Sequence, residues 1–282
     1  MLAESRLFSF INQKDGFTLH FLEGQKLIHD HVLIHPIHQL SFSFYRDLIL
    51  TSQLLLAFLK PDEHFGLYID SDEPYLRYKI EMNENGLMRS LFLPENPNFQ
   101  SVDELNSLTG KCRLYKMMAN AKEPYVSVLN FEKIGLNDIT NLILKNSYQL
   151  SSHILLSPVS DQALMISKLP QQNVDKQTTE QSLEPLQYWD KIKSQFESLF
   201  SKHSCNEEDI IKEIESFGLQ YLASKEVKFK CGCSKERMVR GLWTLCQSSG
   251  IDQVFMPDEQ SIETKCDYCQ TTYQIARSDI VE

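Results

Sequence analysis

The sequence lacks long apolar runs, a signal-peptide-like start and an excess of positive charge. Its most apolar stretch, residues 48–59, is interrupted by Thr51, Ser52 and Gln53 and is far shorter than the roughly 20 residues of a membrane span. The first residues contain no apolar stretch of signal-peptide length. A formal net charge of -10 argues against a nucleic-acid partner and against docking on anionic membrane lipid. We therefore expect a cytoplasmic globular protein.

Signatures of catalysis are also missing. No glycine-rich phosphate loop occurs, and no Ser, His and Asp set stands out for nucleophilic catalysis. The sequence therefore predicts a protein that is not an enzyme.

Residues 1–170 predict an N-terminal α+β domain in which helices are interspersed with antiparallel strands. The spacing of apolar residues over 42–59 predicts a buried helix, and Asn137 is expected to cap a second helix. Strand-like patterns occur at residues 15–28, 65–70, 75–81, 87–93, 111–118, 125–131, 153–156 and 163–169.

The composition changes after Pro170. Residues 171–185 are almost wholly polar and predict a linker, and residues 186–224 predict a helical middle segment with a cap at Asn206. Residues 225–282 form a small C-terminal module. The two expected helices of the middle segment share an apolar stripe made of Trp189, Ile192, Phe196, Leu199, Phe200, Ile210, Ile214 and Phe217.

Four of the seven cysteines occur as two tight pairs in the C-terminal module: Cys231 with Cys233, and Cys266 with Cys269. Zinc prefers four ligands in a tetrahedron, with thiolates at about 2.3 Å. Residues two apart on a strand point to the same side, and a two-residue gap suits a tight turn. The two pairs therefore predict one zinc ion per chain, which supplies much of the folding free energy of so small a module.

The spacing of Cys231 and Cys233 suggests redox chemistry as well. A disulfide between residues two apart closes a small, strained ring that is easily reduced again. Cys112, Cys205 and Cys246 have no nearby partner and are expected to be structural, although Cys246 lies where it can compete during oxidation. The histidines at 29, 31, 35 and 38 fit either a second metal site or polar turn residues.

The cysteine motifs resemble a known family. Phe229-Lys-Cys-Gly-Cys-Ser-Lys-Glu-Arg237 and Cys266-Asp-Tyr-Cys269, with Tyr273 following, closely resemble the zinc module of the 33-kDa heat-shock protein family. Upstream, the resemblance extends in order along the chain through residues 54–60, 123–129, 147–150 and 164–170.

The resemblance implies a redox-regulated holdase chaperone. Such proteins are quiescent when reduced and zinc-bound. Oxidants convert the four cysteines into two disulfides, here Cys231–Cys233 and Cys266–Cys269, and zinc is released. The middle segment then unfolds, and the protein binds unfolding client proteins without ATP. On this reading the apolar stripe becomes a client-binding surface, and the resemblance also implies a homodimer.

Two alternatives remain open at this point. One is a zinc-ribbon module that recruits a specific protein or nucleic-acid partner. The other keeps the chaperone scaffold but makes zinc purely structural. Oxidant-dependent suppression of aggregation separates all three.

Overall fold

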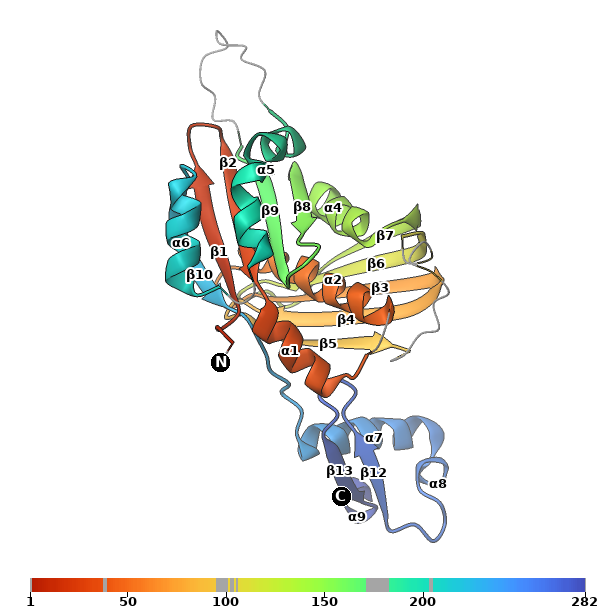
Figure 1. Cartoon of the computed structure of the whole chain (residues 1–282). Helices are drawn as coiled ribbons and strands as arrows, with labels where there is room; N and C mark the ends of the chain where they lie inside the picture. The colour runs from red at the N-terminus through yellow and green to blue at the C-terminus, as the bar shows by residue number, and fades with distance from the viewer. Residues whose placement is uncertain are drawn as a thin grey trace. The chain divides into compact units, whose positions relative to one another are not determined.

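The computed structural model describes residues 2–37, 40–94, 101, 104, 106–170, 183–202 and 205–281. The chain divides into two compact units, Met1–Phe229 and Lys230–Glu282. Antiparallel sheets, helices and a small cysteine-bearing unit at the C-terminal end confirm the expected α+β class (Figure 1). Most of the expected linker, residues 171–182, lies outside the described residues.

The first sheet of the large unit has five antiparallel strands in the order β10-β1-β2-β9-β8. Its strands are β1 (Arg6–Asn12), β2 (Phe17–Glu23), β8 (Ser152–Leu156), β9 (Gln162–Lys168) and β10 (Gln220–Glu226). Both faces of this sheet are covered, because β2 and β9 are buried along almost their whole length. Sequence patterns predicted β2, β8 and β9 but missed the two strands that flank them on one side.

The second sheet has six strands in the order β11-β5-β4-β3-β6-β7. Its strands are β3 (His64–Glu73), β4 (Tyr75–Asn83), β5 (Leu87–Leu93), β6 (Leu108–Met117), β7 (Tyr125–Ile134) and β11 (Lys228–Phe229). Burial alternates strictly along β4, so one face packs in the core and the other is more open. The predicted strands β3 to β7 are confirmed: β3, β4 and β5 follow one another as antiparallel neighbours, while β6 returns to pair with the other side of β3.

Helices fill the space between the two sheets of the large unit. These are α1 (Gln25–Ile34), α2 (Leu40–Leu54) with the short 3-10 helix η1 (Leu55–Phe58), and α4 (Leu136–Ser147). The predicted helix over 42–59 is confirmed. The expected cap at Asn137 is wrong, because α4 begins at Leu136 with Gly135 at the cap position. Residues 25–28, expected at the end of a strand, begin α1 instead.

The middle segment folds within the large unit, on the face of the first sheet opposite α2 (Figure 1). Helix α5 (Pro185–Ser201) begins with proline at its first position, and α6 (Glu207–Ser216) begins at the predicted Asn206 cap, which accepts from the Asp209 N–H at 2.9 Å. Both helices pack on apolar side chains of β1, β2 and β9. This cluster contains Phe8, Phe10, Phe17, Leu19, Phe21, Leu164 and Ile166.

The segment after α6 joins both sheets of the large unit. Strand β10 pairs antiparallel with β1, and β11 pairs in parallel with β5. Between them Val227 is buried, and its N–H donates to the Ser5 carbonyl at 2.8 Å. Gly86 packs closely against the backbone of this segment, because a Cβ added at Gly86 would lie 1.9 Å from the Glu226 carbonyl oxygen. Gln220–Phe229 is therefore an integral part of the large unit, and it immediately precedes the first cysteine pair.

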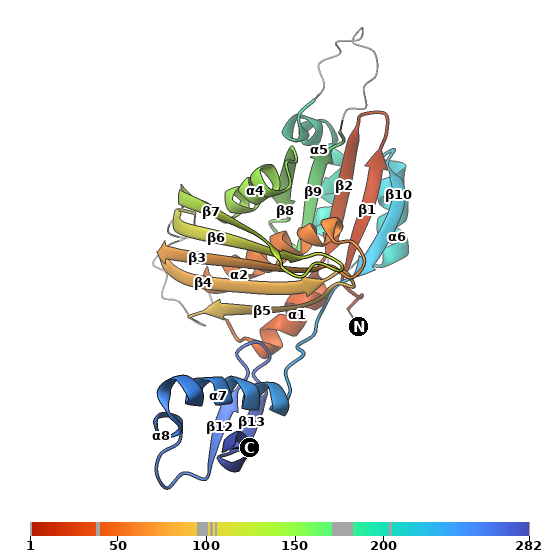
Figure 2. The same ribbon diagram turned by 180° about the vertical axis from the view of Figure 1, so that it is seen from behind.

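The small unit contains α7 (Lys235–Ser249), α8 (Ile251–Val254), α9 (Ser278–Val281) and the hairpin of β12 (Ser261–Lys265) and β13 (Thr272–Ala276), seen from behind in Figure 2. Among the described residues, the buried members of its apolar core are Cys246, Phe255, Ile275 and Ile280. Helix α7 follows a Ser234 cap and ends at Ser249. No helix in the described part of the chain is long and apolar enough to span a membrane.

Candidate metal centre

In the sequence, the first cysteine pair lies between the end of β11 and the start of α7. Ser234 caps α7 by accepting from the Arg237 N–H at 3.3 Å. The Arg237 guanidinium in turn donates to the Gly232 carbonyl at 2.6 Å, which fixes the peptide between the two cysteines. A helix cap and an arginine therefore position Cys231 and Cys233.

The second pair lies in a tight turn that closes the β12–β13 hairpin. The Gln270 N–H donates to the Cys266 carbonyl at 2.8 Å, and the Cys266 N–H donates to the Thr271 carbonyl at 2.9 Å. Gln270 adopts a left-handed conformation, with φ at 60°. This geometry turns the chain within four residues, so the Cys266 and Cys269 sulfurs face the same point.

All four sulfurs converge within 4.8 Å of one another. The Sγ atoms of Cys231 and Cys266 are 3.7 Å apart, and those of Cys233 and Cys269 are 3.2 Å apart. A tetrahedral zinc–thiolate centre with bonds of about 2.3 Å requires sulfur separations of about 3.8 Å. The donor set and its spacing therefore fit a metal ion that prefers four thiolates. Among the described histidine, cysteine, aspartate and glutamate side chains, these four cysteines form the group whose possible ligand atoms converge in this way.

The local surroundings affect the four thiols differently. Burial raises the pKa of Cys231 to about 12 and also raises the pKa of Cys266. Burial opposes ionisation of Cys269 too, but hydrogen bonding with the Thr271 hydroxyl and N–H, and with the Cys233 and Cys266 side chains, outweighs it and brings the pKa of this thiol down to about 7. In the metal-free protein, Cys269 is therefore the thiol most ready to ionise among the three whose pKa is shifted.

Two hydroxyl groups contact the sulfurs. The Tyr273 hydroxyl lies 3.0 Å from Cys233 Sγ, and the Thr271 hydroxyl lies 3.2 Å from Cys269 Sγ. The hydrogen bond to Cys233 raises the pKa of Tyr273 to about 12. Sequence reasoning passed over Thr271 and used Tyr273 only as part of a motif. A hydroxyl residue two to four positions after a ligand cysteine was the available signal.

The other predicted metal ligands do not converge. His31 and His35 are buried beside Tyr45 in the large unit, while His29 lies at the surface of α1. His38 lies outside the described residues. The hypothesis of a second metal site therefore gains no support from the described histidines. Cys112 is buried in the core of the large unit, and Cys246 in that of the small unit.

The expected client-binding stripe is covered. Five of its members are buried against the first sheet, and the other three are partly buried around them. The buried members are Ile192, Phe196, Leu199, Ile210 and Ile214; the others are Trp189, Phe200 and Phe217.

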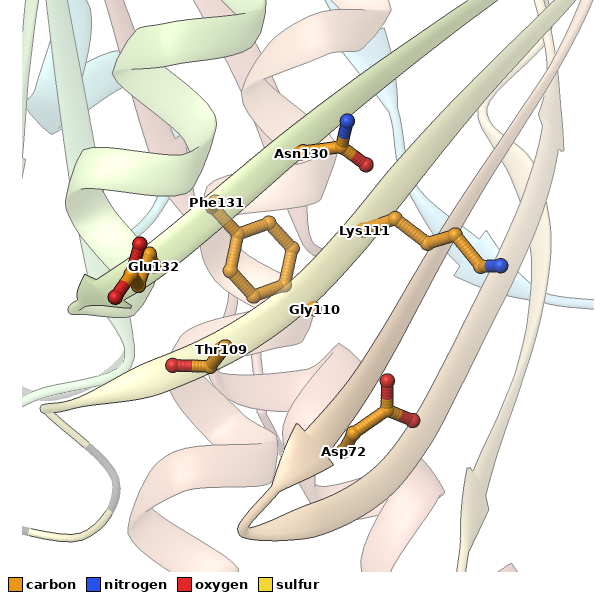
Figure 3. Close-up of a pocket in the computed structure, with 7 residues that line it drawn as sticks. All are labelled: Asp72, Thr109, Gly110, Lys111, Asn130, Phe131 and Glu132. Atoms are coloured by element: carbon orange, nitrogen blue, oxygen red, sulfur yellow. The ribbon is translucent and has the colours of Figure 1, made fainter.

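A hollow lies at one end of the second sheet (Figure 3). It lies beside the bulges of β3, β6 and β7, and the Phe131 ring forms part of its wall. Its lining is Asp72, Thr109, Gly110, Lys111, Asn130, Phe131 and Glu132. Lys111 extends away from Phe131 in Figure 3, so the charged groups do not meet at one point. The cysteine centre is the better candidate site.

Fold and site together define a two-unit α+β protein whose small unit is organised around four thiols able to bind a metal. The model of the Hsp33 protein family matches residues 5–276, and the chain belongs to this family.

Known relatives agree with this assignment. The 33 kDa chaperonin of Vibrio vulnificus is 24% identical over 242 residues, covering 83% of this chain and 79% of the relative. The 33 kDa chaperonin of Agathobacter rectalis is 38% identical over 76 residues, covering 27% of this chain and 26% of the relative. The crystal structure of the 33 kDa chaperonin from Thermotoga maritima matches with a TM-score of 0.71 at 16% identity, over 99% of this chain and 96% of that one. This last likeness concerns the fold.

Proposed function

We propose that the protein is a redox-regulated, ATP-independent holdase that is inactive when reduced and bound to one zinc ion. The convergence of four thiols in a unit with a very small core carries this proposal. Bound zinc would hold Cys231, Cys233, Cys266 and Cys269 as thiolates and stabilise the unit. Family membership and the chaperonin names of the relatives support the chaperone activity.

Oxidation supplies the switch. Peroxide is attacked by one thiolate, so that an S–O bond forms, the O–O bond breaks and hydroxide leaves. A second thiolate then attacks the sulfenic sulfur, an S–S bond forms and a second hydroxide leaves. Each disulfide therefore removes two electrons from a cysteine pair and consumes one peroxide. Two disulfides leave no thiolate for the metal, so zinc is lost together with the stabilisation it gave.

The proposed pairs are Cys231–Cys233 and Cys266–Cys269, as the family resemblance implies. The shortest sulfur separation instead joins the two motifs, 3.2 Å between Cys233 and Cys269. Proximity in a tetrahedral cluster does not select a pairing, because every pair of sulfurs lies within 4.8 Å. Mass mapping of the oxidised protein tests the assignment, and disulfides between the motifs would contradict it.

Activation requires α5 and α6 to leave the first sheet. Their apolar side chains are covered in the resting structure, so release would expose them together with aromatic residues such as Phe8 and Phe21. An apolar surface of this kind suits binding to unfolding client proteins. The segment Gln220–Phe229, between α6 and Cys231, connects the switch to these helices along the chain. We also propose a cytoplasmic location and a homodimer, both from the family resemblance.

Zinc release and holdase activity should appear together. We would treat the zinc-loaded protein with peroxide at raised temperature, follow zinc with a chromogenic chelator and measure aggregation of a denatured client in parallel. Release of about one zinc per chain as aggregation is suppressed, reversed by reductant and zinc, supports the proposal. Cys205→Ser, outside the cluster, is the matched control and should behave as the parent. Zinc release without suppression would favour the alternative of a structural zinc module.

A further inference from the structure

The Tyr273 hydroxyl links the two halves of the cysteine centre. Tyr273 lies on β13, opposite Thr264 of β12, and its ring packs against the core of the small unit. Its hydroxyl reaches Cys233 Sγ, which belongs to the other motif, at 3.0 Å. Thr271, at the start of the same strand region, places its hydroxyl 3.2 Å from Cys269 Sγ. One sulfur of each motif therefore has a hydroxyl neighbour.

The direction of these hydrogen bonds follows from the chemistry of the ligand. A thiolate has no proton and can only accept, so in the metal-binding state each hydroxyl must donate. A donated hydrogen bond draws negative charge from the sulfur. The sulfur then becomes a poorer nucleophile toward peroxide. The same hydrogen bond strengthens metal binding, because it orients the ligand, favours the thiolate over the thiol and reduces repulsion among four thiolates.

We propose that Tyr273 and Thr271 are positioning residues whose hydroxyls donate to the Cys233 and Cys269 thiolates, strengthening zinc binding and slowing the reaction of these sulfurs with oxidants. The rate part of this inference rests on the proposed function. Once a sulfur enters a disulfide it loses its charge, and the hydroxyl loses its strong acceptor. The two hydrogen bonds therefore slow oxidation only while the sulfurs are thiolates. They stop stabilising the reduced centre once the disulfides have formed.

Tyr273→Phe removes one donor and keeps the ring, and Thr271→Val removes the other. Each is expected to weaken zinc binding about 10- to 100-fold in competition with a chelator. In the cobalt-substituted protein, the sulfur-to-metal charge-transfer band should move to lower energy, because the sulfur lone pairs rise in energy when the donor is lost. Zinc release under peroxide should become faster. Thr271→Ser restores a hydroxyl and should recover the parent values, while Thr272→Val, at the neighbouring position of β13, is the control.

Affinity and the charge-transfer band are measured without oxidant or client, so they test the donors even if the protein shows no holdase activity. Unchanged affinity and an unchanged band in both Tyr273→Phe and Thr271→Val would overturn the inference. So would a Thr271→Ser protein that behaves like Thr271→Val. If Tyr273→Phe fails to fold with zinc, the Thr271 pair decides the question alone.

Discussion

The two units of the chain differ most in how they bury apolar surface. In the large unit, two extensive clusters of fully buried side chains lie on either side of the first sheet. In the described part of the small unit, only Cys246, Phe255, Ile275 and Ile280 are buried in the apolar cluster. Apolar burial is the main favourable contribution to folding, so the large unit can be stable alone while the small one needs an added constraint. The proposed redox switch therefore lies in the unit with the smaller apolar core.

Metal removal should have the largest effect on the difference in stability between the two units. A strong chelator under reducing conditions should unfold residues 230–282 and leave the two sheets of the large unit folded, because about 10–16 kcal/mol of metal binding is lost from the small unit alone. Amide hydrogen exchange read by peptide should show loss of protection over α7, β12 and β13. Protection in β2, β9 and β3 should persist.

Cys231→Ser gives the same test without a chelator, and Cys112→Ser, in the large unit, is its control. If the small unit kept its protection without metal, its modest core would be sufficient and the contrast between the units would be wrong. If both units unfolded together, they would form a single cooperative system.

The second effect concerns the side chain at the centre of the middle segment. Phe196 is fully buried in the cluster of the first sheet, with its ring tilted against Trp189 and edge-on to Phe217. Phe196→Ala should destabilise the docked helices by about 3–5 kcal/mol. Binding of a hydrophobic fluorescent dye by the reduced, zinc-loaded protein should therefore increase. Leu186→Ala on the same helix is the control, because Leu186 is exposed. Equal dye binding by both variants would show that the stripe does not hold α5 in place.

The third effect tests the connection between the middle segment and the cysteine centre. Gly86 has φ at +74°, and a Cβ there would meet the Glu226 carbonyl oxygen at 1.9 Å. Gly16 has φ at +78° with nothing within 4 Å. Backbone strain should lower the free energy of unfolding of both alanine variants by about 1–2 kcal/mol. The clash in Gly86→Ala should lower it by about 1–3 kcal/mol more. Urea unfolding of the large unit gives this difference, and equal losses would contradict close packing of Glu226 on the turn.

Sequence patterns predicted part of this fold for identifiable reasons. β4 of the second sheet alternates buried and more exposed residues, and the cysteine pairs have ligand spacing, so both can be recognised from the sequence. β10 was missed because Gln220–Glu226 shows no alternation, and only pairing with β1 makes it a strand. α1 was missed because its histidines suggested turns or a metal, while His31 is a buried core residue. The contacts of Tyr273 and Thr271 with sulfur depend on the closed hairpin, which no local pattern specifies.

The smallest effect expected is a pH dependence confined to the large unit. Burial lowers the pKa of His31 to about 4, and that of His20 likewise. His31 Nδ1 donates to the Leu27 carbonyl at 2.8 Å, while Nε2 has no hydrogen-bond partner among the described residues and the ring packs against Phe229. A proton on Nε2 would therefore be buried without an acceptor, near a second imidazole, His35, whose charge also disfavours it.

Between the folded value near 4 and the ordinary value of 6.5, the unfolded state binds more protons, so stability falls as pH falls through this window. From pH 7 to 5.5 each histidine should remove about 1 kcal/mol from the free energy of unfolding of the large unit. His31→Phe should remove its share of this slope whatever its effect on stability at pH 7. His20→Phe should remove a similar share, and the double variant both. Phe229, which packs against His31, lies in β11 just before the first cysteines. If the dependence of unfolding free energy on pH did not change in His31→Phe, a group other than His31 would make this part of the large unit sensitive to mild acid.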